Sequence, residues 1–382
     1  MPDPDRVTID RTTPSPALPN LLGLPRRRLA EALAPHVDRP YRVEQVYRAL
    51  YEHRAEGFDT MTDLGRALRR ELARHFAIRR PEIAARHVSG DGTVKVLFRL
   101  DDGATVEAVD IPDGRRRTLC VSSQAGCALG CRFCVTGFWG AGRDLTAGEI
   151  VGQVQVADSR VVDSRVVDGQ TAESWPAGDA DGLNLVFMGM GEPLLNLGNL
   201  ADALEILFER ISWRRVTVST AGVIPGIEAM ARWPRRPQLA ISLHAPDDER
   251  RSALMPINDR YPLDALLAAL ERWPLAPRQR LTFEYILIRD FNDAPADADA
   301  LARRLARLRA KVNLIPLNED PVLGELRAPA PERVELFRRR LAGHGLRTTV
   351  RRRRGEDVSA ACGQLRAFGR SPRGFRHSRF SF

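Results

Sequence analysis

Six short runs of β-forming residues, separated by helical stretches, determine how most of this chain can fold. An amphipathic segment such as 198–211 or 263–273 lies between most of the runs. Strands that alternate with helices form parallel sheets with helices packed on their faces. Because six such units fall short of the eight in a closed barrel, we predict an α/β fold built on a partial (β/α)6 TIM-like barrel. The six runs are residues 118–124, 183–191, 215–222, 237–245, 281–288 and 311–318.

The residues before the barrel follow two other patterns. Between residues 25 and 80, apolar side chains recur at spacings of three and four, which predicts amphipathic helices. Residues 88–112 alternate apolar and polar side chains around Asp-Gly turns, which predicts a β-hairpin. We therefore divide the chain into an N-terminal helical accessory region (1–87), a β-hairpin linker (88–112), the α/β core (113–357) and a C-terminal segment (358–382).

One stretch interrupts the alternation of strands and helices. A tandem DSRVV repeat occupies residues 158–162 and 163–167, and a polar, Gly-rich sequence follows it. Long polar segments without a periodic apolar pattern lie on protein surfaces. We predict a surface insertion at about 157–182 that has no chemistry of its own.

Clustered arginines give the chain its positive charge. With 58 Lys and Arg against 49 Asp and Glu, the 382 residues carry a formal net charge of +9. Arginine runs lie at 26–28, 115–117 and 351–354, and an Arg/Phe-rich tail covers 366–382. Such clusters have the composition that binding to phosphate groups requires. Solvated surfaces of an Arg-rich soluble protein explain the same runs equally well.

The sequence contains no sign of a membrane or secretory destination. No apolar run approaches the roughly 20 residues that cross a bilayer, and the first residues contain no apolar signal-peptide segment. We therefore expect a cytoplasmic protein without membrane contacts, in which the thiols are reduced.

Four of the five cysteines lie within residues 120–134. Cys127, Cys131 and Cys134 have the spacing C-x3-C-x2-C, and nearby glycines allow the backbone to wrap closely around a bound group. Three thiolates on one loop can hold a four-iron cluster whose fourth iron is open to a substrate or cofactor. A zinc site with a distant fourth ligand and ordinary reduced thiols are the alternatives. The spacing favours the open cluster.

Further segments share their order and spacing with one known family. The three-thiol loop, with Phe133 before its last cysteine, is followed by FMGMGEPLLN, RRVTVSTAGVIP, AISLHAPDDERR, VNLIPLN and ACGQL. From about residue 40 to 365, the chain resembles the RlmN/Cfr family of the radical S-adenosylmethionine (radical SAM) superfamily. Members of this family methylate an adenine carbon in 23S ribosomal RNA. The resemblance implies a partial barrel of the radical SAM type and an RNA-binding role for the N-terminal helices.

The resemblance also implies cofactors and partners. Cys127, Cys131 and Cys134 would hold a [4Fe-4S] cluster, and two molecules of SAM would be used in each turnover. The substrate would be 23S rRNA, with tRNA as a second substrate in some members. An electron would come from a reducing partner such as flavodoxin or ferredoxin. We expect the protein to be a monomer.

Three catalytic residues follow from the same resemblance. Cys362 in ACGQL matches the cysteine that receives a methyl group from the first SAM and later adds it to adenine as a methylene radical. Cys120 matches the thiol that releases the product by forming a transient disulfide with Cys362, and Glu107 matches the proton acceptor. On residue type alone, Cys120 would be a buried strand residue, and Glu107 would be a solvent-facing strand residue among several carboxylates.

The implied SAM contacts gather at the carboxyl ends of the predicted strands. Gly191 and Glu192 match contacts to the methionine part of SAM, where glycine permits close approach and a carboxylate can pair with the ammonium group. Taken singly, residues of this kind more often cap strand ends. We consider them together because they all lie at the same edge of the predicted sheet. The other matching positions are Ser219, Ser242, Leu243, His244 and Asn318.

The motif after the second strand favours methylation of adenine carbon 2. GEPLLN resembles the carbon-2 enzymes, whereas relatives that act on carbon 8 carry alanine after the glutamate. The first alternative is carbon-8 (Cfr-like) methylation of 23S rRNA. The second is another radical SAM reaction in which Cys120 and Cys362 are structural. The third is a non-catalytic, metal-bound RNA-binding protein of ribosome assembly.

Overall fold

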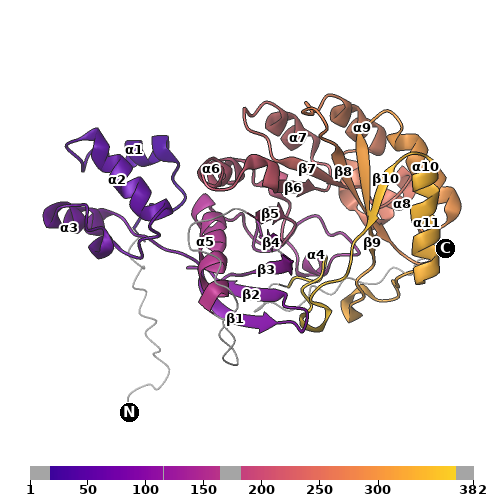
Figure 1. Cartoon of the computed structure of the whole chain (residues 1–382), viewed down its shortest axis with the longest axis horizontal. Helices are drawn as coiled ribbons and strands as arrows, with labels where there is room; N and C mark the ends of the chain where they lie inside the picture. Colours follow the sequence, from indigo (N-terminus) through magenta and orange to yellow (C-terminus); the bar gives the residue numbers. More distant parts are fainter. Residues whose placement is uncertain (1–17, 115, 164–181, 367–382) are drawn as a thin grey trace, which may run out of the picture. The chain divides into compact units, whose positions relative to one another are not determined.

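The computed structural model describes residues 18–114, 116–163 and 182–366 (Figure 1). These residues form two compact units, which are described separately. The smaller unit contains the described residues up to 79 except 23–25, and the larger unit contains 23–25 and the described residues from 80 onward. Most of the predicted insertion and the Arg/Phe-rich tail after residue 366 lie outside the described residues.

Three helices make up most of the smaller unit, as the sequence predicts. They are α1 (Arg26–Leu33), α2 (Pro40–Tyr51) and α3 (Arg66–His75), with a 3-10 turn, η1, at Phe58–Thr60. Apolar residues three or four positions apart lie on one side of each helix, and this side is buried. Leu29 and Leu33 of α1, Tyr47 and Leu50 of α2 and Leu72 of α3 are almost completely buried.

A ten-stranded sheet forms the larger unit, and its strands follow the order of the sequence. The strands are β1 (Glu82–Val88), β2 (Val94–Arg99), β3 (Thr105–Asp113), β4 (Arg116–Cys120), β5 (Leu183–Phe187), β6 (Val216–Thr220), β7 (Gln238–Ser242), β8 (Leu281–Leu287), β9 (Ala310–Pro316) and β10 (Arg347–Val350). Strands β1 to β4 pair antiparallel, and strands β4 to β10 pair parallel. Among the strands that the structure describes, β10 pairs only with β9, so the parallel part is an open, partial barrel.

Most of the helices in the larger unit lie along the outer side of the curved parallel strands (Figure 1). The helices of this unit are α4 (Val135–Trp139), α5 (Ala147–Asp163), α6 (Leu197–Leu207), α7 (Ile224–Ala231), α8 (Asp248–Leu254), α9 (Leu263–Glu271), α10 (Pro295–Leu305) and α11 (Pro331–Gly343). Short 3-10 turns lie between these strands and helices: η2 (Pro193–Leu195), η3 (Trp213–Arg215), η4 (Pro256–Asp259), η5 (Pro321–Leu323) and η6 (Glu356–Val358). Among the described residues, no helix combines the length and the apolar character that a membrane crossing requires.

Two strands, β1 and β10, differ from the sequence prediction. The predicted hairpin is part of a four-stranded antiparallel meander that begins with β1, and the parallel sheet has a further strand, β10. Their sequences, EIAARHV and RTTV, lack a regular apolar alternation, and most of their side chains are at least partly exposed. Both strands lie at edges of the sheet, where a strand needs little apolar surface.

Candidate active site

The carboxyl ends of the parallel strands enclose a cavity that contains most of the predicted site residues. We call it the thiol cavity, because three cysteines of the β4–α4 loop line it together with Cys362. The predicted residues on its wall are Cys127, Cys131, Cys134, Gly191, Glu192, Ser219, Ser242, His244 and Cys362. The predicted residues that do not line it are Cys120, Glu107, Leu243 and Asn318.

Glycines and backbone hydrogen bonds shape the three-thiol loop. Gly126 has a φ of 124°, and a Cβ atom there would lie 2.7 Å from the carbonyl oxygen of Gly140, so only glycine fits. The Cys127 N–H donates to the same carbonyl at 3.0 Å, and the Cys134 N–H donates to the carbonyl of Cys131 at 3.1 Å. These contacts hold the loop in a conformation in which all three cysteines face one cavity.

The spacing of the three sulfurs indicates which metal centre they fit. Thiolates on one tetrahedral zinc ion lie about 3.8 Å apart, because each Zn–S bond is about 2.3 Å long. Among the described residues, the sulfurs of Cys127, Cys131 and Cys134 do not all lie within 4.8 Å of one another. Burial raises the pKa of Cys127 to about 12, so thiolates at this place need a positively charged centre. The wider spacing fits an iron–sulfur cluster, in which each thiolate binds a different iron.

The turn after β5 holds a buried carboxylate against the thiol cavity. Gly191 has a φ of 94°, and a Cβ atom there would lie 2.4 Å from the side chain of Gln124. The Glu192 carboxylate accepts backbone N–H groups of Leu194 at 3.0 Å and Ala221 at 2.7 Å. Burial raises its pKa. A buried carboxylate held in this way favours a ligand that supplies a positive charge, such as an ammonium group.

His244 supplies a neutral imidazole to the same cavity. Its Nδ1 accepts the backbone N–H of Ile286 at 3.0 Å, so the ring proton is on Nε2. Burial, with a smaller effect of the Arg251 charge, lowers the pKa of His244 to about 3. The ring packs edge-on against Phe133, with 4.5 Å between centroids. Ser219 and Ser242 line the same cavity near the ends of β6 and β7. These groups can bind uncharged polar atoms of a ligand.

The C-terminal segment brings Cys362 to the cavity from a distant part of the sequence. The carbonyl of Gly363 accepts the N–H of Val135 at 2.6 Å, and the Thr136 hydroxyl donates to the carbonyl of Leu365 at 2.7 Å. Both donors belong to α4, directly after the three-thiol loop. Cys362 is therefore attached to the same helix that follows the third thiol.

Cys120 lies at the end of β4 and is buried. Burial, with a smaller contribution from the charge of the neighbouring Cys362, raises its pKa to about 12. The two thiols are therefore close enough to influence each other electrostatically. All five cysteines are free thiols in the structure.

Glu107 is buried in β3, and the solvent-facing alternative for this residue is therefore wrong. Its Oε1 lies 3.2 Å from Lys95 Nζ, and its Oε2 accepts the backbone N–H of Arg366 at 2.8 Å. Burial raises the pKa of Glu107, although Lys95 acts in the opposite direction. Lys95 Nζ also donates to the carbonyl of Ser359 at 3.4 Å. Lys95 thus contacts the segment that carries Cys362 before this cysteine, at Ser359, and Glu107 contacts it after this cysteine, at Arg366.

Known proteins match both units of the chain. The family model described as the radical SAM superfamily matches residues 121–302, and the one described as the ribosomal RNA large subunit methyltransferase N-terminal domain matches residues 19–78. "Dual-specificity RNA methyltransferase RlmN" of Anaeromyxobacter dehalogenans is 45% identical over 92% of this chain and 92% of its own. The protein of the same name from Syntrophotalea carbinolica is 46% identical over 88% of this chain and 87% of its own. The chain belongs to the RlmN family.

A solved structure has the fold of this RlmN-family chain. The crystal structure of a radical SAM methyltransferase from Sphaerobacter thermophilus superposes with a TM-score of 0.82 at 41% sequence identity. The match covers 91% of this chain and 99% of that chain. The predicted family and the predicted fold class are both confirmed.

Arg251 is a residue of the RlmN-family site that the sequence analysis did not single out. It is completely buried, and its guanidinium donates to the carbonyls of Leu243 (3.1 Å), Ala221 (2.6 Å) and Ser242 (3.1 Å). Arg251 therefore fixes the chain where β6 and β7 end. Leu243, a predicted SAM contact, takes part in this arrangement through its backbone. As the second of two arginines after the acidic pair that starts α8, Arg251 gives no signal of such burial in the sequence.

Asn318 lines a second cavity, which we call the arginine cavity. Its wall contains Arg351–Arg354, Asn318, Cys362, Asp113 and Thr118. The Asn318 Nδ2 donates to the carbonyl of Cys362 at 2.9 Å. Cys362 and Arg351 line both cavities.

Two charged residues beside Cys362 were also missed. Glu284 of β8 is buried and lines the thiol cavity, and burial raises its pKa. Arg351 follows β10, and the nearby Cys362, followed by Glu284, raises the pKa of its guanidinium. A single glutamate within the apolar run LTFEYILI is the signal that could have pointed to a buried functional carboxylate.

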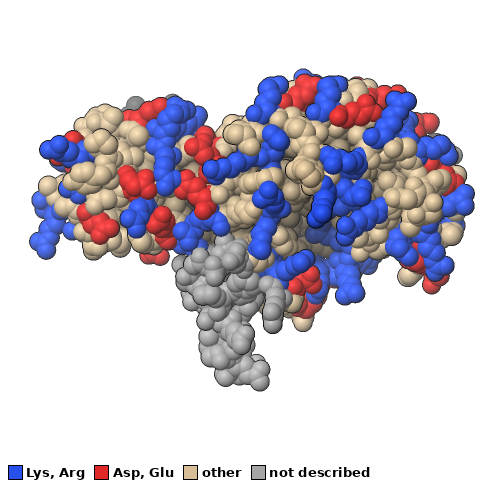
Figure 2. All heavy atoms as spheres, turned by 45° about the horizontal axis from the view of Figure 1, so that its top comes forward, with Lys and Arg blue, Asp and Glu red and all other residues tan. Residues whose placement is uncertain are grey.

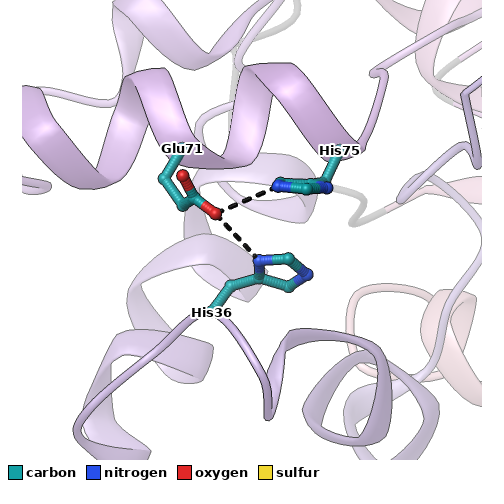
Figure 3. Close-up of side chains that lie close together, drawn as sticks. All are labelled: His36, Glu71 and His75. Carbon is teal, nitrogen blue, oxygen red and sulfur yellow. Dashed lines mark hydrogen bonds and ion pairs between the residues drawn. The ribbon is translucent and has the colours of Figure 1, made fainter.

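Two histidines in the smaller unit share the carboxylate of Glu71 (Figure 3). His36 Nδ1 lies 3.3 Å and His75 Nε2 lies 3.0 Å from Glu71 Oε1. Arg74 also donates to this carboxylate. The hydrogen bond from His36 is the main cause that lowers the pKa of Glu71. Because N–H groups directed at an oxygen leave no lone pair for a cation, we interpret the cluster as an ion network and not as a metal site.

Proposed function

We propose that this protein is a radical SAM methyltransferase that methylates carbon 2 of an adenine in RNA, with 23S rRNA and tRNA as substrates. The observation that carries the proposal is the meeting of three groups of residues in one cavity: the three thiols, the implied SAM contacts and Cys362. The relatives named "Dual-specificity RNA methyltransferase RlmN" support the choice of substrate, because they match over nearly the whole chain.

The thiol cavity has a suitable donor for each implied partner. Cys127, Cys131 and Cys134 would hold a [4Fe-4S] cluster, and Glu192 would pair with the ammonium group of SAM. His244, with its proton on Nε2, and the hydroxyls of nearby serines would bind uncharged parts of SAM. When bound, the cluster and SAM supply a carbon radical, which is what the unreactive C–H bond of adenine requires.

The remaining residues act on the methyl group and on the target base. Cys362 receives the methyl group from a first SAM, so that an S–CH3 bond forms, the sulfonium bond of SAM breaks and the thiol proton is lost. After a hydrogen atom of this methyl group is removed with a second SAM, its carbon bonds to the adenine. Glu107 would accept the proton from the ring carbon, and the unpaired electron of the adduct would pass to a one-electron acceptor, a role that the cluster held by the three-thiol loop can supply. The raised pKa of Glu107 makes it a better proton acceptor than an exposed carboxylate.

Cys120 completes the proposed cycle. Its thiolate attacks the sulfur of Cys362, the bond from that sulfur to the methylene carbon breaks, and this carbon takes up a proton to become the new methyl group. The disulfide that forms between Cys120 and Cys362 is transient, and a cellular reductant must return two electrons to it. We propose that a flavodoxin or ferredoxin donates the single electron for SAM cleavage and that the protein acts as a monomer.

Nucleoside analysis tests the proposal. The protein is reconstituted with iron and sulfide without oxygen, reduced, and incubated with SAM and 23S rRNA transcribed in vitro. The RNA is then digested, and the nucleosides are identified by mass spectrometry. We expect 2-methyladenosine, and none from a Cys362→Ala control. Detection of 8-methyladenosine would instead support the Cfr-like reaction, and a protein that never cleaves SAM would support the non-catalytic alternative.

A further inference from the structure

The antiparallel meander lies beside the part of the chain that carries Cys362, which we call the Cys362 segment (residues 354–366). The turn between β1 and β2, residues 89–93, is hydrogen-bonded to the start of this segment (Figure 1). Farther along the meander, Lys95 of β2 contacts the segment before Cys362, and Glu107 of β3 contacts it after Cys362. The meander therefore holds the segment on both sides of the cysteine.

Two aspartates join the β1–β2 turn to the Cys362 segment in opposite directions. Asp357 of the segment accepts the Ser89 hydroxyl through Oδ1 at 2.5 Å and the Gly90 N–H through Oδ2 at 3.1 Å. In return, Asp91 of the turn accepts the N–H of Gly355 through Oδ2 at 3.2 Å. We call these contacts the aspartate clasp. Hydrogen bonds to a carboxylate are stronger than those between neutral groups, so the clasp is a firm attachment between segments far apart in the sequence.

The backbone of the Cys362 segment is closely fitted to the β1–β2 turn. Gly355 has a φ of 63°, and a Cβ atom there would lie 2.7 Å from the Cβ of Ala360 and 3.0 Å from the Cγ2 of Thr93, which is completely buried. Ser359 has a φ of 50°, which a residue with a side chain keeps only when surrounding contacts hold it. Lys95 Nζ provides one such contact, at 3.4 Å from the Ser359 carbonyl oxygen. The segment thus owes its conformation to contacts with the meander.

The charges of the clasp oppose the repulsion within an arginine run. Arg351–Arg354 lead into the Cys362 segment, and basic side chains also gather around a hollow on one face of the larger unit (Figure 2). Like charges at close range repel one another, and Arg354 lies 3.8 Å from Asp91 and 3.6 Å from Asp113. Although burial acts in the opposite direction, hydrogen bonds lower the pKa of Asp91 to about 2, and a hydrogen bond from the turn lowers the pKa of Asp357. Both aspartates are therefore charged at neutral pH.

We propose that Asp91 and Asp357 are positioning residues, which hold the Cys362 segment against the β1–β2 turn and thereby set the place of the methyl-accepting thiol. In the described part of the chain, both aspartates lie outside the walls of the thiol cavity and the arginine cavity. They therefore act through the segment and not on a bound ligand. The inference rests on the proposed function of Cys362 and adds to it the part of the fold that keeps this cysteine in place.

Two rates at Cys362 test the inference, and both are followed by mass spectrometry of the peptide that contains this residue. Full-length protein is produced under iron limitation, its Cys362 is confirmed to be unmethylated, and the cluster is reconstituted without oxygen. The first rate is methylation of Cys362 by SAM in the absence of RNA. The second is alkylation of Cys362 by iodoacetamide in the absence of SAM, which does not depend on methyl transfer.

The variants separate the clasp from a general loss of stability. Asp357→Ala removes both hydrogen bonds of this carboxylate, whereas Asp357→Asn keeps an oxygen for the Gly90 N–H and an N–H for the Ser89 oxygen. Ser89→Ala, which removes one hydroxyl from the clasp, is a milder test variant. The matched control is Asp299→Ala, because Asp299 also joins distant segments, through Arg340 and His344.

We expect Asp357→Ala to methylate Cys362 about tenfold more slowly than the wild type, because the thiol is no longer held in place. Alkylation of Cys362 should become severalfold faster, since a released segment exposes the thiol more often. Ser89→Ala should change both rates in the same directions by a smaller factor. Asp357→Asn should recover most of the wild-type behaviour, and Asp299→Ala should match the wild type. Iron content and the rate of SAM cleavage should be the same in all variants, because the three-thiol loop is intact.

A wild-type rate of methylation or of alkylation in Asp357→Ala would overturn the inference. Loss of iron from this variant would also overturn it, because the clasp would then support the three-thiol loop and not Cys362. If Asp357→Ala does not fold, the same two rates in Ser89→Ala decide the question. If wild-type protein is alkylated but never methylated at Cys362, the proposed function itself fails, and the alkylation rates of the variants still test the clasp.

Discussion

The two cavities that meet at Cys362 differ in what their walls offer. The thiol cavity presents cysteines, apolar side chains and buried groups such as Glu192 and His244. The arginine cavity presents Arg351–Arg354 and a single carboxylate. A wall with many apolar side chains suits radical chemistry, whereas a wall rich in arginine suits anionic groups. The difference teaches that Cys362 lies between two environments of opposite character, because it lines both cavities.

Removal of a thiol-loop ligand should have the largest effect. In Cys127→Ala, two thiolates remain, which cannot hold the cluster in its open three-thiolate form. We expect the iron and sulfide content of anaerobically reconstituted protein to fall severalfold, and SAM cleavage and RNA methylation to be lost. Cys120→Ala is the control and should keep its iron, because Cys120 is not in the loop. A Cys127→Ala protein with full iron content would contradict the assignment of the thiol cavity.

Substitution of Cys362 or Cys120, the two cysteines outside the three-thiol loop, should separate SAM cleavage from the later steps of RNA methylation. Cys362→Ala should abolish RNA methylation while SAM cleavage continues, because the cluster loop is intact. Cys120→Ala should stop the reaction after the base is bound to Cys362, and a covalent protein–RNA adduct should accumulate on a denaturing gel. If either variant formed 2-methyladenosine at the wild-type rate, its thiol would be structural only.

Glu107→Gln tests the proton acceptor next to the C-terminal segment. We expect the rate of RNA methylation to fall by about 10² to 10⁴, the usual contribution of a general base, while Cys362 methylation without RNA is unchanged. Burial raises the pKa of Glu107 above its ordinary value of 4.5. The base form is therefore lost as the pH falls through this raised pKa, and wild-type activity should decline there. If the activity of Glu107→Gln declined at low pH in the same way as that of the wild type, another group would be the base.

Glu192→Gln should have the smallest of these effects. It should weaken the binding of SAM in the thiol cavity and leave the binding of RNA unchanged. Hydrogen bonds to charged groups contribute about 1.5–3 kcal/mol, so SAM affinity measured by calorimetry should fall by about 10- to 100-fold. Glutamine can also accept only one of the two backbone N–H groups that Glu192 holds, and thermal unfolding serves as the control for stability. RNA affinity should not change. An equal loss of RNA affinity would mean that the two cavities are not independent.

The parts of the molecule that could be predicted depend on residues close together in the sequence. The parallel strands and their helices follow from local apolar patterns, and the three-thiol loop follows from one short motif. Glu107 shows the opposite case, because its burial is produced by Lys95 and by the backbone of Arg366, far along the chain. The place of Asn318 was missed for the same reason, because it depends on the backbone of Cys362, whereas strand β10 was missed because its short sequence has no apolar alternation. Polar residues become buried beside a site in this way through contacts between segments that are far apart in the sequence.

The attachment of the C-terminal segment to α4 has a consequence for maturation of the protein. The helix that follows the third loop thiol also holds the segment that carries Cys362, through Val135 and Thr136. Any movement of the three-thiol loop as it takes up its inorganic centre would therefore be passed on to the methyl acceptor, because these two hydrogen bonds join the segment to α4.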